Sequence, residues 1–109
     1  MNRDTVLLVM FDLPVTDRAA RRGAARFRRG LIRNGYTMLQ RSIYFKLITN
    51  VSLSSYEYKQ ISEMFPGRGD VRFLPIPLNQ FSRIQTLGQE DEMEDFDLDF
   101  CFSPLVEFV

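Results

Sequence analysis

The sequence predicts an α+β domain with the element order βαββαβ. Three observations support this prediction. An apolar run of strand length stands near the N-terminus, two stretches carry apolar residues at helical spacing and end in glycine-containing turns, and the runs that follow them have the length and residue types of strands. The order predicts an antiparallel sheet with two helices on one face, which is the ferredoxin-like arrangement.

The first predicted element is a strand over Thr5–Phe11. These seven residues are almost wholly apolar, and Val6 and Val9 are β-branched, which is typical of a strand buried on both faces. Asp12 follows at the carboxyl end of this strand, where open sheets commonly place their chemistry. Asp12 is therefore the first candidate functional residue.

A helix with one apolar side is predicted next. Thr16 is expected to cap a helix that starts at Asp17, and Asn34-Gly35 is a typical stop signal. The stripe expected to face the core recurs at spacings of four, three and four residues: Ala20, Ala24, Phe27 and Leu31.

Two closely joined strands are predicted after this helix, over Tyr36–Leu39 and Ser42–Ile48, with their turn around Gln40-Arg41. In the second of them, apolar residues alternate with Ser42, Tyr44 and Lys46. Period-two alternation predicts that the two faces of this strand have different surroundings.

The second helix is predicted from a capping-box spacing, Ser54 with Glu57, and from a hydrophobic staple between Leu53 and Tyr58. Its predicted buried side is Tyr58, Ile61 and Phe65, and Pro66-Gly67 is expected to end it. A fourth strand over Val71–Ile76 is expected near a sheet edge because of its prolines, and Phe81–Leu87 is expected to add a short fifth strand.

Length and composition predict one domain, which we expect in the cytoplasm and away from membranes. A chain of 109 residues is near the common size of a single domain, and no stretch approaches the roughly 20 apolar residues of a membrane span. A single cysteine, Cys101, excludes an internal disulfide and fits a reducing compartment.

The net charge of zero hides a strong asymmetry along the chain. All 14 basic residues lie within residues 1–88 together with six acids, whereas residues 89–109 carry eight acids and no base. The sequence therefore divides into a basic domain, 1–88, and an acidic C-terminal tail, 89–109.

Arginines on the first helix form a candidate nucleic-acid surface. Twelve of the 14 basic residues are arginine, which favours bidentate phosphate recognition, and Asp17 is the only acid between Pro14 and Tyr56. A charged helix face is commonly only a solvated surface, but one without balancing acids repels itself unless phosphates are near. The aromatic residues mostly occupy core positions, so no motif for stacking the bases of single-stranded RNA stands out. We therefore expect duplex DNA, bound through its phosphates, as the ligand. The candidate contacts are Arg18, Arg22, Arg29, Arg33, Arg41 and Lys46.

The acidic tail has a period-two pattern of its own. Its apolar residues Phe96, Leu98, Phe100 and Phe102 alternate with Asp95, Asp97, Asp99 and Cys101. One interpretation is a disordered acidic tail; the other is a strand that pairs with the edge of another chain. The aligned apolar side chains favour partner docking.

Several short motifs resemble one known family, the small metal-dependent nuclease of CRISPR spacer-acquisition modules (CRISPR-associated protein two). The resemblance covers about residues 5–87 and rests on Phe11-Asp12-Leu13-Pro14, an arginine-rich helix ending in Asn34-Gly35-Tyr36, Gln40-Arg41-Ser42-Ile43-Tyr44, and residues 74–81. The proline pair Pro75 and Pro77 departs from the expected strand sequence there.

The resemblance implies a ferredoxin-like homodimer in which two Asp12 residues share one Mg²⁺ or Mn²⁺ ion. One carboxylate is few for Mg²⁺, and a symmetric dimer supplies a second. In that setting Asp12 would be both metal ligand and catalytic residue of an endonuclease that hydrolyses phosphodiester bonds with metal-activated water. Asp12 could instead simply stabilise the strand–helix turn.

Three functions stay open at this point. The favoured one is a dimeric adaptor in spacer acquisition, which binds the prespacer duplex and the family's larger integrase, with endonuclease activity as associated chemistry. The alternatives are a purely structural, non-catalytic scaffold and an endoribonuclease acting on single-stranded RNA. No glycine-rich loop supports a further option, a regulatory module for a small ligand.

Overall fold

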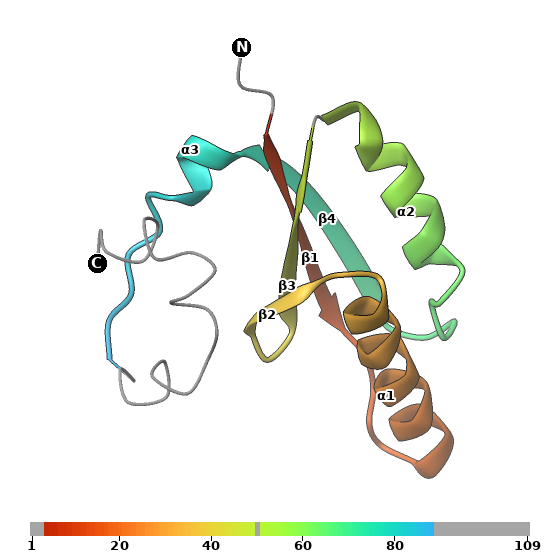
Figure 1. Cartoon of the computed structure of the whole chain (residues 1–109). Helices are drawn as coiled ribbons and strands as arrows, with labels where there is room; N and C mark the ends of the chain where they lie inside the picture. Colours follow the sequence, from red (N-terminus) through yellow and green to blue (C-terminus); the bar gives the residue numbers. More distant parts are fainter. Residues whose placement is uncertain (1–3, 50, 89–109) are drawn as a thin grey trace. The chain divides into compact units, whose positions relative to one another are not determined.

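The computed structural model describes residues 4–49 and 51–88. The chain divides into two compact units, residues 1–76 and residues 77–109. The elements in order are β1 (Thr5–Asp12), α1 (Arg18–Arg33), β2 (Thr37–Gln40), β3 (Ile43–Ile48), a 3-10 turn (Val51–Leu53), α2 (Ser54–Ser62), β4 (Asp70–Pro77) and α3 (Leu78–Phe81) (Figure 1).

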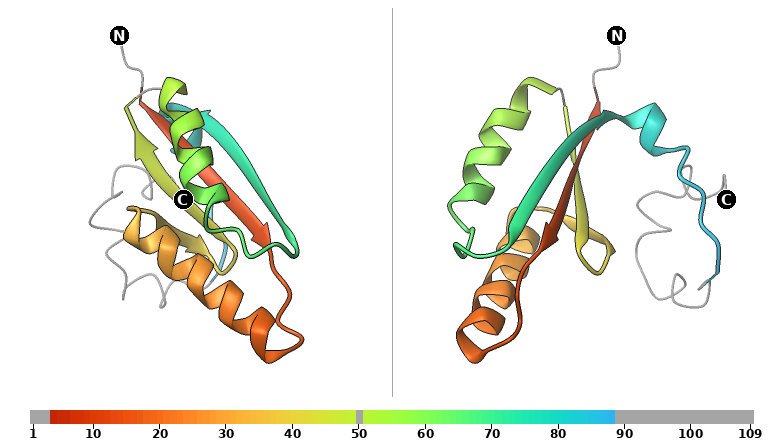
Figure 2. Two further views of the ribbon diagram at one scale, coloured as in Figure 1. Left: turned by 90° about the vertical axis from the view of Figure 1, so that its right-hand side faces the viewer. Right: turned by 180° about the vertical axis from the view of Figure 1, so that it is seen from behind.

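The four strands form one sheet in the order β2-β3-β1-β4, which confirms the predicted antiparallel α+β fold. β3 is antiparallel to both β1 and β2, with Leu8 opposite Phe45 in the first pair. A register shift between Met38 and Gln40 interrupts the second pair. Both views in Figure 2 place α1 and α2 on the same side of the strands.

The core lies between this sheet and the two helices. The predicted stripe of α1 is buried throughout, and Phe27 packs edge-on against Phe11 of β1 with 5.1 Å between ring centroids. Phe11 also contacts Tyr44 of β3 at 5.7 Å. The remaining members of the cluster are Leu7, Val9, Leu31, Tyr36, Ile48 and Ile61.

The other face of the sheet is also apolar, although neither α1 nor α2 covers it. Tyr44 and Ile48 of β3 belong to the core cluster, so Leu47 points to the opposite face, where its exposed fraction is 47%. On β4, Phe73 packs against the cluster and Leu74, which is 46% exposed, points away from it. Val6 and Phe45 of the same face are buried, so only part of this face is exposed. We call this surface the open face.

The helix α1 begins at Arg18, and its cap is Asp17 rather than the predicted Thr16. Asp17 has extended backbone angles (φ −136°, ψ 176°), and its carboxylate accepts a hydrogen bond of 2.8 Å from the Ala20 amide. Both residue types make good caps, and only the backbone conformation decides which of two neighbours holds the position.

The predicted capping box of α2 is wrong. The residue before this helix is Leu53, which makes no side-chain cap, and the Ser54 hydroxyl has no hydrogen-bond partner within the described part of the chain. Glu57 is buried and binds other groups, described below. Because the helix ends at Ser62, Phe65 lies beyond it and is partly exposed, contrary to prediction.

Other predictions for α2 and the second unit have mixed outcomes. Ile61 is buried as predicted, and half-buried Tyr58 stacks obliquely on Phe73 at 4.6 Å. In the second unit the expected strand over Phe81–Leu87 is wrong, since this unit begins with α3 and a turn in which the Ser82 amide donates to the Leu78 carbonyl at 2.9 Å. The predicted docking residues, within 96–102, lie outside the described residues.

None of the helices in the described ranges is long and apolar enough to span a bilayer.

Candidate functional site

Asp12 is the last residue of β1, and its side chain is exposed. Two other acids of the described residues are paired: Asp17 contacts Arg68, and Asp70 contacts Arg72 at 3.6 Å. Across residues 4–49 and 51–88, no group of three or more potential metal ligands occurs. A single chain therefore offers one free carboxylate at this point.

Gly69 fixes the backbone beneath that carboxylate. It has a positive φ of 87°, and a Cβ atom built on it would overlap the backbone carbonyl oxygen of Asp12 and lie 3.0 Å from the Leu13 Cα. Only glycine fits both the conformation and the space. Gly69, the residue before β4, therefore packs directly against the end of β1 and restrains the backbone of Asp12.

The Asp17 carboxylate lies in the segment between β1 and α1 and contacts two groups. It accepts the hydrogen bond from Ala20 and lies 3.5 Å from the guanidinium of Arg68. These contacts hold the pKa of Asp17 below its usual value, mainly through the Ala20 hydrogen bond and next through the charge of Arg68. Asp17 is thereby a structural and positioning group rather than a free metal ligand.

The predicted arginine face exists on α1. Arg18, Arg22, Arg29 and Arg33 are all exposed, and none of them forms an ion pair with another residue of the described ranges. Arg41 is exposed in the β2–β3 turn. The α1 arginines thus share one helix, whereas Arg41 and Lys46 come from other elements.

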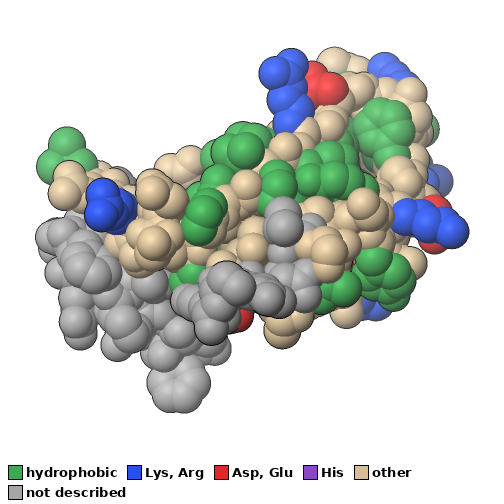
Figure 3. All heavy atoms as spheres, turned by 90° about the horizontal axis from the view of Figure 1, so that it is seen from above, with side chains coloured by type: hydrophobic (Ala, Val, Ile, Leu, Met, Phe, Trp, Pro, Cys, Tyr) green, Lys and Arg blue, Asp and Glu red, His purple; other side chains and the backbone are tan. Residues whose placement is uncertain are grey.

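Basic side chains do not gather on every side of the molecule. Seen from above, they project at separate points around the edge, with hydrophobic side chains between them (Figure 3).

Lys46 is held by a buried carboxylate. Its Nζ donates to Glu57 Oε2 at 2.9 Å, and the Tyr36 hydroxyl donates to Glu57 Oε1, also at 2.9 Å. Burial, and next the hydrogen bond to Glu57, raise the pKa of Tyr36 well above its usual value. Since Glu57 already satisfies the Lys46 ammonium, a phosphate contact by Lys46 stays a prediction.

Sequence reasoning missed three groups near these residues. Glu57 was assigned to a helix cap, and Gly69 and Arg68 were not singled out. The segment Pro66-Gly67-Arg68-Gly69 has the composition of a flexible turn. This composition does not indicate that Gly69 packs against the end of β1. Spatial neighbours from separate segments leave no spacing signal in one sequence.

Comparisons with known proteins show the family to which the chain belongs. A family model described as CRISPR associated protein Cas2 matches residues 5–84. A protein of Parvibaculum lavamentivorans named CRISPR-associated endoribonuclease Cas2 is 39% identical over 79 residues, which cover 72% of this chain and 78% of the relative. Proteins of the same name from Acidovorax ebreus (35% identity; 74% of this chain, 79% of the relative) and Lacticaseibacillus rhamnosus (36%; 69% and 74%) are also similar.

The matched region contains β1 with Asp12, the arginine-bearing α1, the whole sheet and α3. Because the family model covers well over half of the sequence, and relatives above 30% identity align over most of both chains, the resemblance of the short motifs is confirmed. The chain belongs to the CRISPR-associated Cas2 family.

Proposed function

We propose that this protein works in CRISPR adaptation as a dimeric DNA-binding adaptor in the cytoplasm. In this role it bridges copies of the larger integrase and holds the prespacer duplex. The observation that carries the proposal is that an exposed Asp12 ends the strand before α1, whose exposed Arg18, Arg22, Arg29 and Arg33 form no ion pair among the described residues. Metal-dependent phosphodiester hydrolysis is the associated chemistry.

The arginine face supports the DNA-binding part of this role. Guanidinium groups bind phosphates bidentately, and contacts to phosphates give affinity without reading bases. A scaffold that holds prespacers of any sequence needs this kind of contact. Arg18, Arg22, Arg29, Arg33, Arg41 and Lys46 are the proposed contacts.

The open face supports the homodimer. Leu47 and Leu74 are almost half exposed there, together with half-buried Leu8 and Met10 of β1. A sheet face of this kind is stabilised when a second copy covers it, and a two-fold dimer places the same residues of both copies together.

A dimer also fits the metal. One Asp12 per chain is too few for a site of its own, and two would match the one or two carboxylates that Mg²⁺ takes beside waters. A Mg²⁺ or Mn²⁺ ion bound there would supply an activated water and offset phosphate charge. The side chains of this protein would contribute the two carboxylates and orient the nucleic acid through α1.

The tail carries the remaining part of the proposal. Phe96, Leu98, Phe100 and Phe102 would dock the larger integrase by adding a strand to its sheet edge. Truncation after Leu87 is then expected to abolish complex formation with the integrase while leaving the metal-dependent chemistry of Asp12.

A second candidate function, cleavage of single-stranded RNA, is favoured by the names of the relatives. Three similar proteins are named endoribonucleases, at 35–39% identity. With the same Asp12 pair and the same arginines, single-stranded RNA would be an alternative substrate for hydrolysis.

Cleavage and binding assays on the Asp12→Asn variant test the proposal. Labelled single-stranded RNA and duplex DNA are incubated with wild type and variant, with Mg²⁺ or with a chelator. We expect cleavage to require both metal and Asp12, and duplex binding to survive the substitution, because α1 carries it. Loss of duplex binding in a folded Asp12→Asn protein would contradict the proposal that Asp12 serves cleavage and α1 serves duplex binding.

A further inference from the structure

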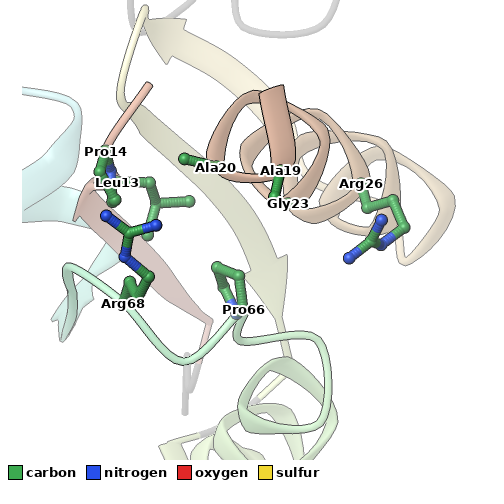
Figure 4. Close-up of a pocket in the computed structure, with 8 residues that line it drawn as sticks. All are labelled: Leu13, Pro14, Ala19, Ala20, Gly23, Arg26, Pro66 and Arg68. Atoms are coloured by element: carbon green, nitrogen blue, oxygen red, sulfur yellow. The ribbon is translucent and has the colours of Figure 1, made fainter. Parts of the chain in front are cut away.

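An open pocket of about 230 Å³ lies directly after Asp12. It is formed by the β1–α1 loop, the first half of α1 and the loop before β4 (Figure 4). Most of its lining is apolar: Leu13, Pro14, Ala19, Ala20, Gly23 and Pro66. Two arginines, Arg26 and Arg68, complete it.

The two arginines lie at opposite ends of the pocket. Figure 4 shows Arg68 beside Leu13 and Pro14, Arg26 on α1 at the far end, and Pro66 and Gly23 between them. Among the described residues, no carboxylate lines the pocket. Its walls are thus suited to a flat apolar group, and its ends to negative charge.

Asp17 sets the position of one of these arginines. The Arg68 guanidinium lies 3.5 Å from the Asp17 carboxylate, and both side chains are more than half exposed. An exposed pair of this kind is weak and is easily exchanged for a stronger partner. A phosphate at the pocket mouth could therefore take the place of Asp17 on Arg68.

We propose that this pocket binds one unpaired nucleotide of a nucleic-acid strand, with its base against the proline and alanine wall and its phosphates on Arg68 and Arg26. This inference rests on the proposed nucleic-acid binding and adds a site to it. Since Leu13 and Pro14 follow Asp12 directly, the bound strand would run past the Asp12 carboxylate. The protein would then hold an unpaired end as well as a duplex.

The test measures the affinity of short fluorescent DNA probes, single-stranded and duplex, for the full chain by anisotropy. Ala19→Leu fills the pocket from an exposed position without changing charge, and Arg68→Gln removes one phosphate ligand. Lys59→Gln removes the same charge from an exposed site on α2 and serves as the control. Asp17→Asn keeps a residue that caps helices well while freeing Arg68.

We expect Arg68→Gln to weaken single-strand binding by about tenfold, the size of a lost charge-assisted contact. Ala19→Leu should weaken it as well, because the larger side chain fills the pocket, and both variants should change duplex binding less than about twofold. Asp17→Asn should tighten single-strand binding, and Lys59→Gln should change neither affinity. Unchanged single-strand binding in Ala19→Leu and Arg68→Gln would overturn the pocket while leaving the adaptor role intact. An equal loss on both probes would also overturn it, since the effect would then not depend on an unpaired nucleotide.

Two further outcomes separate the sources of the ligand. Binding of a free deoxynucleoside monophosphate that Ala19→Leu abolishes, with single-strand binding unaffected by the same substitution, would show that the pocket takes free nucleotides and would overturn the proposal. Wild-type protein that bound neither probe would overturn the proposed function and the pocket together.

Discussion

Gly69 shows how a single residue without a side chain can support a functional one. Its left-handed conformation brings the chain against the carbonyl of Asp12, where no Cβ atom fits. Gly67, two residues earlier, has a similar φ of 94° but open space around it. A side chain at residue 67 would therefore introduce conformational strain alone, whereas a side chain at residue 69 would also introduce steric overlap.

We expect Gly67→Ala to lower the free energy of unfolding by about 1 kcal/mol, the cost of a left-handed alanine. Gly69→Ala should cost about 3 kcal/mol, because the backbone of Asp12 and Leu13 must also move. Urea denaturation of the two variants measures the difference. Equal losses would mean that the contact at Asp12 carries no energy.

The buried Glu57 is a second residue whose role depends on its neighbours. Lys46→Met would leave its carboxylate without a charged partner and is expected to cost about 3 kcal/mol of stability. Tyr36→Phe removes one hydrogen bond to a charged group and should cost about 2 kcal/mol. Lys59→Met, at an exposed position of α2, is the control and should be nearly neutral in the same denaturation experiment. A neutral Lys46→Met would show that the ion pair does not anchor α2.

At the scale of elements, α1 combines a buried stripe with an unbalanced basic face. Its arginine pairs Arg18/Arg22 and Arg29/Arg33 are four residues apart, a spacing at which like charges repel and cost the helix a few tenths of a kcal/mol. Packing of Phe27 and Leu31 against the sheet holds the helix despite this repulsion. We therefore expect α1 to bind phosphates through these arginines. We also expect that replacing some of them does not lower the stability of the protein.

The combined variant Arg22→Gln and Arg29→Gln tests this directly. We expect its affinity for duplex DNA to fall and the slope of log K against log salt to decrease in magnitude by about 2, since each lost phosphate contact removes about 0.9. Thermal stability should be unchanged or slightly higher. Arg72→Gln, whose exposed side chain lies beside Asp70, is the control and should leave the slope as it is. An unchanged slope in the double variant would assign α1 to solvent alone.

The sequence predicted the elements of the first unit well, and it failed where a choice depended on spatial neighbours. The core stripe of α1 follows from helical spacing, and the Thr5–Phe11 strand follows from its length and composition. In contrast, Glu57 stands at a capping distance from Ser54 yet pairs with Lys46 and Tyr36 of other segments. The residues 81–87 contain no period strong enough to separate a strand from the short α3 and its turn.

For the site, the sequence predicts Asp12 and the α1 arginines as candidates, since each belongs to a local pattern. It did not identify the pocket, because Pro14, Gly23 and Arg68 come from three separate segments. A single sequence reports which residues share a helix or strand, but not which loops meet.

At the scale of the whole molecule, the open face sets the expectation of a dimer. We expect Leu74→Glu to turn the dimer into a monomer, because it places a charge in an apolar interface, and to weaken Mg²⁺ binding with it. The control variant Tyr56→Glu places the same charge at an exposed position of α2, away from this face, and should stay dimeric. Sedimentation equilibrium distinguishes these results. A dimeric Leu74→Glu protein would place the interface elsewhere.

Integration of a prespacer into a repeat-containing plasmid, reconstituted with the larger integrase, tests the adaptor role most directly. Wild type is compared with Asp12→Ala in the presence of Mg²⁺, after the variant has been shown to be folded and dimeric. We predict that Asp12→Ala supports integration, because in the proposed role the adaptor would hold DNA through α1 and dock its partner through the tail. Loss of integration in a complex that still assembles on DNA would contradict the account, and would assign to Asp12 chemistry that acquisition requires.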